Sequence, residues 1–420
     1  MNRTEESRVG APGPGGSPSR LRVLAYTSLG HFINDGTTLF VPVVAALLTS
    51  QKQVDPLDLA LLFLIYYTSS SLLSLWVGRR ADLSGRPALL MAGGLLLLGA
   101  GLVGFYAALA LFTGPWTLGL SLGSGFVTGF GTAFYHPLGG TLLQERFQGP
   151  ERGKALGING AMGSTGRALY PVLFFLIGLV VAADASLAVF ALFAGVAGVV
   201  ILLVSRERAR LVAGAAPRGG PTTRSVLTRG VVLLAGVAFL RSVASQGIVA
   251  WLPTYLTLHP AGFGAPNLGL EVATIYVAGI LGQPVFGVLV GHWDRRGLLA
   301  LSSLGTALAT LGFLFSSGWE ATGCLLLIGF FTFSAFPLLM SLTPDYLSSG
   351  SSTLANSVVF GLATGGGSAV GPTVVGLVAF RGYATLPLGL EVMVGIGLAS
   401  AVAVAFLPRP GARSRMPLFG

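Results

Sequence analysis

The residues most able to do chemistry are ionisable side chains that stand inside long apolar segments. Asp35, Arg167 and Arg241 each fall near the centre of such a segment. A charged group in an apolar medium is costly, so each of the three is expected to face a cavity or a partner. A carboxyl group beside movable cations can bind and release a proton, and an arginine can hold an anion with two hydrogen bonds. These residues therefore indicate proton exchange and anion binding.

Further polar residues accompany these three at helical spacing. His31, Asn34, Asp35 and Thr38 follow an i, i+3, i+4, i+7 pattern, which places them on one face of a helix. We predict that Asp35 and His31 form a proton-coupling pair. The predicted substrate-binding residues are Asn34, Arg167, Arg241, Gln246, Tyr67, Asn159, Tyr135, His136, Trp251 and Asn356.

A structural interpretation stands beside each of these functional ones. Asp35 can serve only as the ion-pair partner of Arg167 or Arg241, and the sequence leaves open which of the two. The arginines can lock helices together instead of contacting substrate. His136 precedes a proline near a helix end, where a gating role is favoured over substrate contact. Trp251 can be an aromatic anchor at the membrane surface.

The composition identifies the medium that these residues occupy. Of 420 residues, 53% are hydrophobic and 10% are charged, whereas a soluble domain carries about 25% charged residues. The single cysteine, Cys324, excludes a disulfide scaffold and a cysteine-rich metal site. The net charge of +10 is distributed as membrane topology requires, which argues against nucleic acid as a partner. The protein is therefore predicted to cross a lipid bilayer many times.

Twelve apolar segments of about 20 residues or more are long enough to cross the hydrocarbon core. Because they are too long for barrel strands, all are expected to be helices. The predicted fold is an all-α polytopic membrane protein with two pseudo-symmetric six-helix bundles. The segments are 23–49, 57–78, 88–112, 115–136, 153–181, 185–205, 229–256, 268–290, 298–317, 319–343, 352–379 and 384–407.

Lysine and arginine predict the orientation of these helices. With the N-terminus inside, the inner segments hold twenty-one of these residues and the outer loops hold only Lys52 and Arg381. Both termini are therefore expected in the cytoplasm, and the first apolar run is read as a retained span, not a signal peptide. The predicted division is a disordered basic tail (1–22), a bundle (23–205), a linker (206–228), a second bundle (229–407) and a C-terminal tail (408–420).

Short sequence motifs and prolines that recur in the two halves suggest a duplicated six-helix unit. Phe40-Val41-Pro42 corresponds to Trp251-Leu252-Pro253, 211 residues later, and Asp82-x-x-Gly85 corresponds to Asp294-x-x-Gly297, 212 residues later. Two further pairs follow in the same order, His136-Pro137 with Thr343-Pro344, and Pro171 with Pro372. Repeats with a binding site between them at the membrane midplane are the architecture of secondary transporters.

The loop that follows the second span resembles the signature of the major facilitator superfamily. Gly78-Arg79-Arg80-Ala81-Asp82-Leu83-Ser84-Gly85-Arg86 fits the family pattern Gly-x-Leu-Ala-Asp-Arg-x-Gly-Arg-Arg at Gly78, Ala81, Asp82, Gly85 and Arg86. The resemblance implies a cytoplasmic latch that holds the outward-facing state. The predicted gate residues are Gly78, Asp82, Gly85, Arg86, Asp294 and Arg295.

Within the superfamily, the segment His31-Phe32-Ile33-Asn34-Asp35-Gly36 resembles the first helix of fosmidomycin-resistance-type efflux transporters. Tyr135-His136-Pro137 and Trp251-Leu252-Pro253-Thr254-Tyr255-Leu256 support the same resemblance. It implies proton-coupled export of a drug or small anion. The glycine-rich antiporter motif of the fifth helix departs from the family, since Arg167 stands where a proline is expected.

The leading hypothesis is a secondary transporter that works by alternating access as a proton-coupled antiporter and exports a small organic molecule, with an anion favoured. One alternative is a proton symporter that imports a carboxylate or sugar-like metabolite, and another is a non-transporting receptor or sensor. We expect no enzymatic activity, no cofactor and no metal, with the proton gradient as energy source and Na⁺ as the alternative coupling ion. The expected protein is a monomer in the plasma membrane of a prokaryote.

Overall fold

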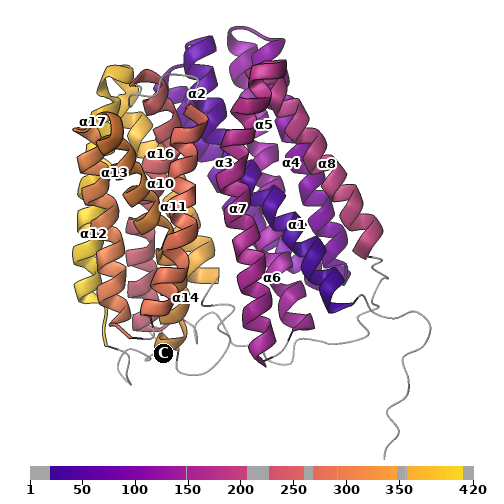
Figure 1. Cartoon of the computed structure of the whole chain (residues 1–420), viewed down its shortest axis with the longest axis vertical. Helices are drawn as coiled ribbons and strands as arrows, with labels where there is room; N and C mark the ends of the chain where they lie inside the picture. Colours follow the sequence, from indigo (N-terminus) through magenta and orange to yellow (C-terminus); the bar gives the residue numbers. More distant parts are fainter. Residues whose placement is uncertain are drawn as a thin grey trace, which may run out of the picture.

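A computed structural model describes residues 19–147, 149–205, 227–259, 268–290, 292–347, 355 and 357–409, and these residues are almost wholly helical (Figure 1). Among them, eleven helices are long and apolar enough to cross a membrane, and all eleven coincide with predicted spans. The remaining predicted span, 115–136, is also helical, but its glycines and hydroxyl residues make it less apolar. Asn356, most of the predicted tails and most of the predicted linker lie outside the described residues.

The first half of the chain forms one bundle. Prolines at the first helical positions start three of its helices, where a missing N–H costs nothing. The helices are α1 (Arg20–Thr38), α2 (Phe40–Lys52), α3 (Pro56–Ser84), α4 (Pro87–Ala110), α5 (Pro115–Thr132), α6 (Tyr135–Arg146), α7 (Gly149–Val181) and α8 (Ala183–Ser205).

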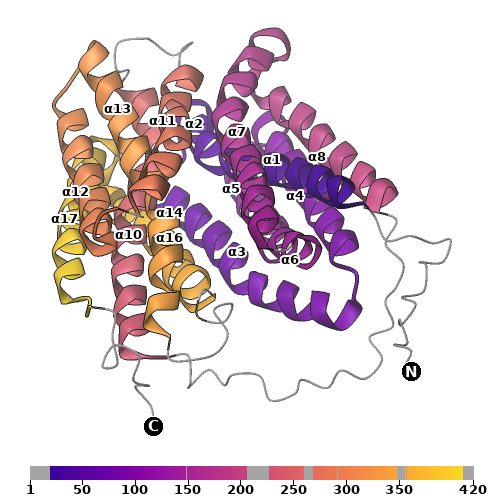
Figure 2. The ribbon, with the colours of Figure 1, turned by 60° about the horizontal axis from the view of Figure 1, so that its bottom comes forward.

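The second half forms the other bundle, which lies beside the first (Figures 1 and 2). A π-helical segment, η3 (Ser357–Thr364), leads directly into one of its long helices. Its α-helices are α10 (Arg229–Leu258), α11 (Leu268–Leu289), α12 (Arg295–Leu314), α13 (Gly318–Phe333), α14 (Ala335–Leu342), α16 (Gly365–Val378) and α17 (Leu386–Ala403).

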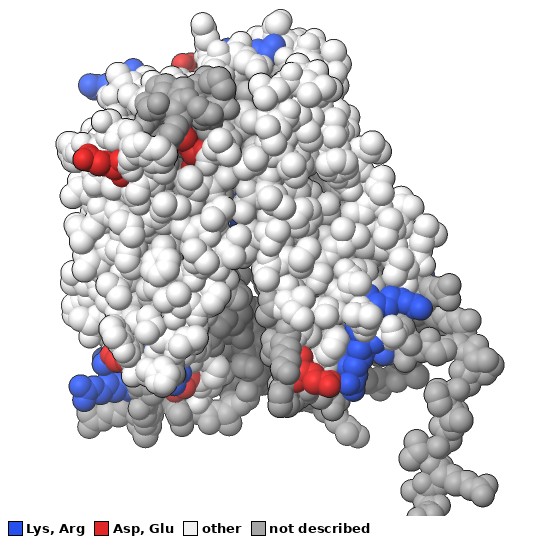
Figure 3. Space-filling view, in the orientation of Figure 1, with Lys and Arg blue, Asp and Glu red and all other residues white. Residues whose placement is uncertain are grey.

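The two bundles touch along three helix pairs, α2 with α10, α3 with α16, and α7 with α11. Near the end of α2, the Tyr383 hydroxyl lies 2.9 Å from the Thr49 hydroxyl and also donates to the Val54 carbonyl, which ties the halves together. Lower down, α6 and α14 stand apart in both ribbon views. In Figure 3 the described surface likewise parts into two lobes in the lower part of the face shown.

Prolines interrupt the helix in three of the spans, and each interruption lies about four residues before the proline. A proline removes a backbone N–H and its ring pushes against the carbonyl four residues earlier. Pro42 accordingly follows the break between α1 and α2, Pro137 the break between α5 and α6, and Pro337 the break between α13 and α14. The sequence comparison paired Pro137 with Pro344, but the structure pairs it with Pro337, 200 residues later. Pro344 instead starts a short 3₁₀ turn after α14.

The outer surface is that of a protein surrounded by lipid. In Figure 3 the coloured charged side chains gather toward the upper and lower ends, and the broad band between them is almost entirely white. Large apolar side chains are exposed along the outer helices, among them Leu192 and Leu203 of α8 and Leu281 of α11, at 64%, 71% and 63%. Contact of so large an apolar surface with water would be unfavourable, whereas contact with a bilayer core of about 30 Å is favourable.

Candidate functional site

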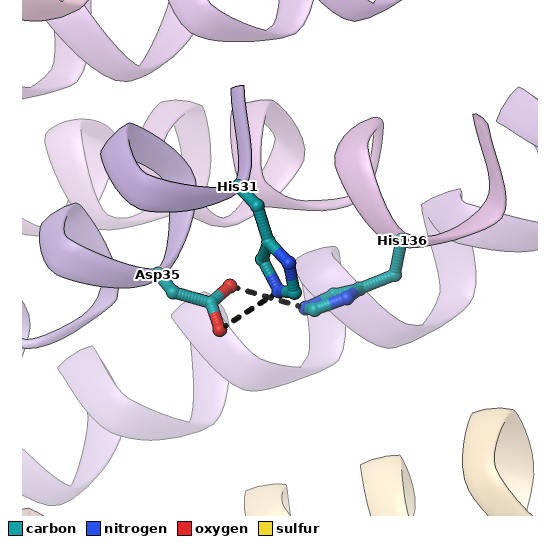
Figure 4. A group of neighbouring side chains, drawn as sticks. All are labelled: His31, Asp35 and His136. Atoms are coloured by element: carbon teal, nitrogen blue, oxygen red, sulfur yellow. Dashed lines mark ion pairs between the residues drawn. The ribbon is translucent and has the colours of Figure 1, made fainter. Parts of the chain in front are cut away.

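Asp35 is the centre of a cluster of polar side chains in the first bundle. Its side chain is 2% exposed, and it lies on α1 one turn before the break at Leu39. His31 Nε2 lies 3.2 Å and Arg167 Nη1 3.3 Å from Asp35 Oδ2, while His136 Nε2 lies 3.5 Å from Oδ1. The Asn34 amide donates to Oδ1 over 3.0 Å. Figure 4 shows the two imidazoles and the carboxylate pointing toward one another from α1 and α6.

His31 is held in one orientation by α6 and α7. Its Nδ1 lies 2.8 Å from the Asn159 carbonyl oxygen and 3.0 Å from Asn159 Oδ1, and the Tyr135 ring stacks on it at 4.5 Å. Because oxygens of this kind only accept, the hydrogen is assigned to Nδ1. Nε2 is therefore the ring atom that His31 presents to the Asp35 carboxylate.

Glycines bring α7 close enough to α1 to make these contacts. A Cβ at Gly163 would lie 2.5 Å from His31 Nε2, and a Cβ at Gly166 would lie 2.2 Å from the Phe32 carbonyl oxygen. Gly36 of α1 plays the same part in reverse, because a Cβ there would lie 2.6 Å from the Tyr170 ring. Small residues permit this close approach of helices in a membrane.

Arg167 connects the cluster to the second bundle. Its guanidinium lies 5.5 Å from the centroid of the Phe333 ring, which is the last residue of α13 before the proline break. The Phe333 ring in turn lies 5.2 Å from that of Tyr276 on α11. Arg167 is 26% exposed, so it is more accessible than Asp35. A cation above an aromatic face is attracted by the ring electrons, and this contact crosses between the halves.

Arg241, in contrast, does not reach Asp35. It is buried in the second bundle, where its Nη2 donates to the Thr332 carbonyl over 2.6 Å, to the Phe331 carbonyl over 3.1 Å and to the Ser302 hydroxyl over 3.0 Å. These carbonyls lie at the end of α13, where the helix has no further N–H groups to offer them. Of the two arginines left open by the sequence, Arg167 is thus the ion-pair partner of Asp35.

The other predicted substrate-binding residues are dispersed. Trp251 is fully buried, donates to the Pro372 carbonyl over 2.8 Å and packs on Phe63 of the other half at 5.4 Å, so it is neither at the membrane surface nor in the cluster. Tyr67 is partly buried and lies against Tyr66 at 4.8 Å. Gln246 is partly buried on α10.

The predicted gate residues lie at helix ends, away from the Asp35 cluster. Gly78 lies in the last part of α3, and Gly85 ends α3 in a left-handed conformation, with φ of 60°, which glycine adopts without strain. Arg86 is exposed, and the side chain of Asp82 is not among the described ones. In the second half, Asp294 caps α12.

Arg295 follows that cap and binds within its own half. It donates to Asp345 over 2.6 Å and to the Ser341 carbonyl over 2.8 Å. Asp345 belongs to the short turn after α14 and Ser341 to α14 itself, so this arginine connects α12 with the end of the broken tenth span.

The internal repeat allows equivalent positions of the two halves to be compared, and they differ in their ionisable residues. With the offset of 211 residues, Asp35 corresponds to Gln246 and His31 to Ser242. With the offset of 201, Arg167 corresponds to Ser368, and the Ser242 and Ser368 hydroxyls lie 3.1 Å apart. Equivalent positions thus carry titratable groups in the first half and neutral ones in the second.

Sequence reasoning missed the aromatic residues that Arg167 faces. Phe333 stands in an apolar run that offers no local signal, and its role comes from the break that Pro337 introduces after it. Tyr276 did carry a signal, since it is a polar residue inside a predicted span.

Two helical bundles with a buried ionisable cluster in the membrane region are the features of a secondary transporter. The family model of the Major Facilitator Superfamily matches residues 27–372, and the chain belongs to this superfamily of transporters. Membership confirms the predicted family, the all-α membrane fold with its multiple spans, and the prediction that the chain is not an enzyme.

Two kinds of relative accompany this match. The fosmidomycin resistance protein of Escherichia coli (strain K12) is 26% identical over 365 residues, which cover 85% of this chain and 86% of that protein. A bacterial homologue of the human lysosomal transporter Spinster, solved in an inward-facing and occupied conformation, superposes with a TM-score of 0.74 at 13% identity and covers 96% of this chain and 99% of that one. Its inward-facing and unoccupied form gives a TM-score of 0.69. These structures show the shared fold.

Proposed function

We propose that the protein is a proton-coupled antiporter that exports a small organic molecule, with an anion as the favoured class. The observation that carries this proposal is the convergence of two histidines and an arginine on Asp35. A carboxylate so placed can be neutralised either by a proton or by its cationic neighbours. Protonation of Asp35 therefore releases Arg167, and loss of the proton recaptures it.

The released Arg167 is the proposed site for the substrate. Its side chain is 26% exposed, and its guanidinium has five N–H donors, which suit a carboxylate or phosphonate group. Phe333 and Tyr276 of the second half supply an apolar wall beside it. A proton on Asp35 and an anion on Arg167 then support one another, whereas deprotonated Asp35 competes with the anion for the same cation.

The direction of transport is supported by the relative. A protein named for resistance to a drug is expected to remove that drug from the cell, and this chain aligns with most of its length. The first alternative, symport of a carboxylate or sugar-like metabolite into the cell, would use the same residues. The two imidazoles beside Asp35 favour H⁺ over Na⁺, because a hard cation prefers oxygen ligands, whereas a proton can be shared between an imidazole nitrogen and a carboxylate oxygen.

The proposed setting is the plasma membrane of a prokaryote, with the protein as a monomer and both termini in the cytoplasm. The excess of lysine and arginine in the predicted inner segments supports this orientation. The contacts at the Tyr383 end and the separation of α6 from α14 would then describe a state open to the cytoplasm. Exchange between this state and its opposite would move the two bundles about the Arg167–Phe333 contact.

The test uses purified protein in liposomes with an imposed pH gradient and a dye that reports internal pH. Organic anions, cations and sugars are added one at a time to the wild type, to Asp35→Asn and to the control Asp55→Asn, whose carboxylate makes no cap hydrogen bond at the start of α3. We expect substrate-driven proton movement in the wild type and the control and none in Asp35→Asn. The sign of the movement separates antiport from symport. Equal substrate flux without proton movement in all three proteins would refute the coupling.

A further inference from the structure

The ligand atoms around Asp35 have a second property, because they are spaced as the ligands of a metal ion are. His31 Nε2, an Asp35 oxygen and His136 Nε2 all lie within 4.8 Å of one another. In a tetrahedral site with bonds of about 2.0–2.1 Å, neighbouring ligand atoms are about 3.3 Å apart. The separation of Asp35 Oδ2 from His31 Nε2 is 3.2 Å, so one of the three edges already matches, and the 3.5 Å separation of His136 Nε2 is measured to the other carboxylate oxygen, Oδ1.

We propose that His31, Asp35 and His136 form a binding site for one first-row transition-metal cation of the Zn²⁺ type. Two imidazoles and a carboxylate are ligands that such cations accept, and three protein ligands leave one position for water. The His136 side chain is 60% exposed, so its ring can turn to close the two remaining edges. The ion would tie α1 to α6.

Groups behind the ligands orient them for this purpose. The Asn159 carbonyl occupies Nδ1 of His31 and leaves Nε2 free to bind, which is the arrangement that outer partners impose on metal-binding histidines. The Asn34 amide holds Asp35 Oδ1 over 3.0 Å, and the Tyr135 ring stacks on His31. Two of the three ligands, His31 and Asp35, are therefore already held in the orientation that metal binding requires.

Arg167 opposes the ion. Its Nη1 lies 3.3 Å from Asp35 Oδ2, so a metal cation must displace it from the carboxylate. The guanidinium already lies above the Phe333 ring at 5.5 Å and can stay there once the ion pair is broken. This opposition has a measurable consequence, because removal of the charge at position 167 must strengthen metal binding.

Binding is measured on the purified full chain, without a polyhistidine tag, at one fixed pH. Co²⁺ is titrated in while the visible absorption bands of the four-coordinate ion are recorded, and Zn²⁺ is then added to displace it. We expect one ion per chain. His136→Ala removes one of the three ligands and is expected to weaken binding about 100-fold, the upper end of what the loss of a ligand's outer partner costs. His259→Gln is the matched control, since His259 stacks on Tyr255 outside the cluster.

Arg167→Gln makes the test independent of folding defects, because a misfolded chain would not bind more tightly. We expect this variant to bind at least tenfold more tightly than the wild type. Equal affinity in the wild type, His136→Ala and Arg167→Gln would overturn the proposal, as would a wild type that shows no four-coordinate Co²⁺ spectrum. A bound ion would occupy the atoms that carry the proton and stop transport; that consequence rests on the proposed function, whereas the titration needs no transport and fails or succeeds separately.

Discussion

The packing of α7 on α1 can be tested with one methyl group. In Gly166→Ala, the added Cβ would lie 2.2 Å from the Phe32 carbonyl oxygen, where ordinary contacts begin at 3.4 Å. The obstacle is backbone, so it cannot rotate away, and the helices must separate by about 1.2 Å. If α7 moves by this amount, the 2.8 Å contact between His31 Nδ1 and the Asn159 carbonyl lengthens to about 4 Å and is lost as a hydrogen bond.

The control is Gly160→Ala on the same helix, where the added Cβ meets nothing within 4 Å. Both variants gain about 1 kcal/mol of helix propensity, and only Gly166→Ala suffers overpacking of about 1–3 kcal/mol. Thermal unfolding of the purified proteins should therefore show a lower midpoint for Gly166→Ala and an equal or higher one for Gly160→Ala. Substrate-driven proton movement should fall in the first variant alone. If the two variants unfold alike and transport alike, the close α1–α7 contact is not what holds His31 in place.

Three further outcomes are expected. Arg241→Ala removes the donor of the Thr332 carbonyl at the end of α13, whereas the Phe331 carbonyl keeps the Ser302 hydroxyl as a donor. A hydrogen bond to a charged group is worth about 1.5–3 kcal/mol, so the unfolding midpoint should fall clearly, and an unchanged midpoint would contradict the capping role. Trp251→Phe removes the bond to the Pro372 carbonyl and leaves a cavity where the larger indole was, so it should cost more than about 1 kcal/mol, whereas Trp116→Phe on the exposed surface should cost nothing measurable. Tyr383→Phe weakens the contact between the halves at one end by about 1 kcal/mol, which corresponds to about a fivefold increase in the population that is open at that end. A cysteine placed at Tyr67 in a Cys324→Ala background should then react faster with a thiol reagent added from that end. Equal labelling would refute the contact as a gate.

The membrane fold could be predicted from the sequence because its main cause is local. Segments of apolar residues long enough for a bilayer must form helices, since lipid offers the backbone no other hydrogen-bond partners. The same holds for the polar face of the first helix, because i, i+4 spacing alone puts His31 and Asp35 side by side. The predicted span with the weakest hydropathy signal was the glycine-rich segment 115–136, which nevertheless forms a helix.

The partners of Asp35 could be decided only by the tertiary structure. Arg167 and Arg241 look alike in sequence, each a cation in mid-span, yet α7 packs on α1 through Gly163 and Gly166 while α10 turns Arg241 toward the end of α13. Composition and spacing describe one helix at a time and contain no information on which helices adjoin. The position of Phe333 over Arg167 depends in addition on a proline break in another half of the chain. The sequence thus predicted which residues carry the chemistry, and packing determined which of them meet.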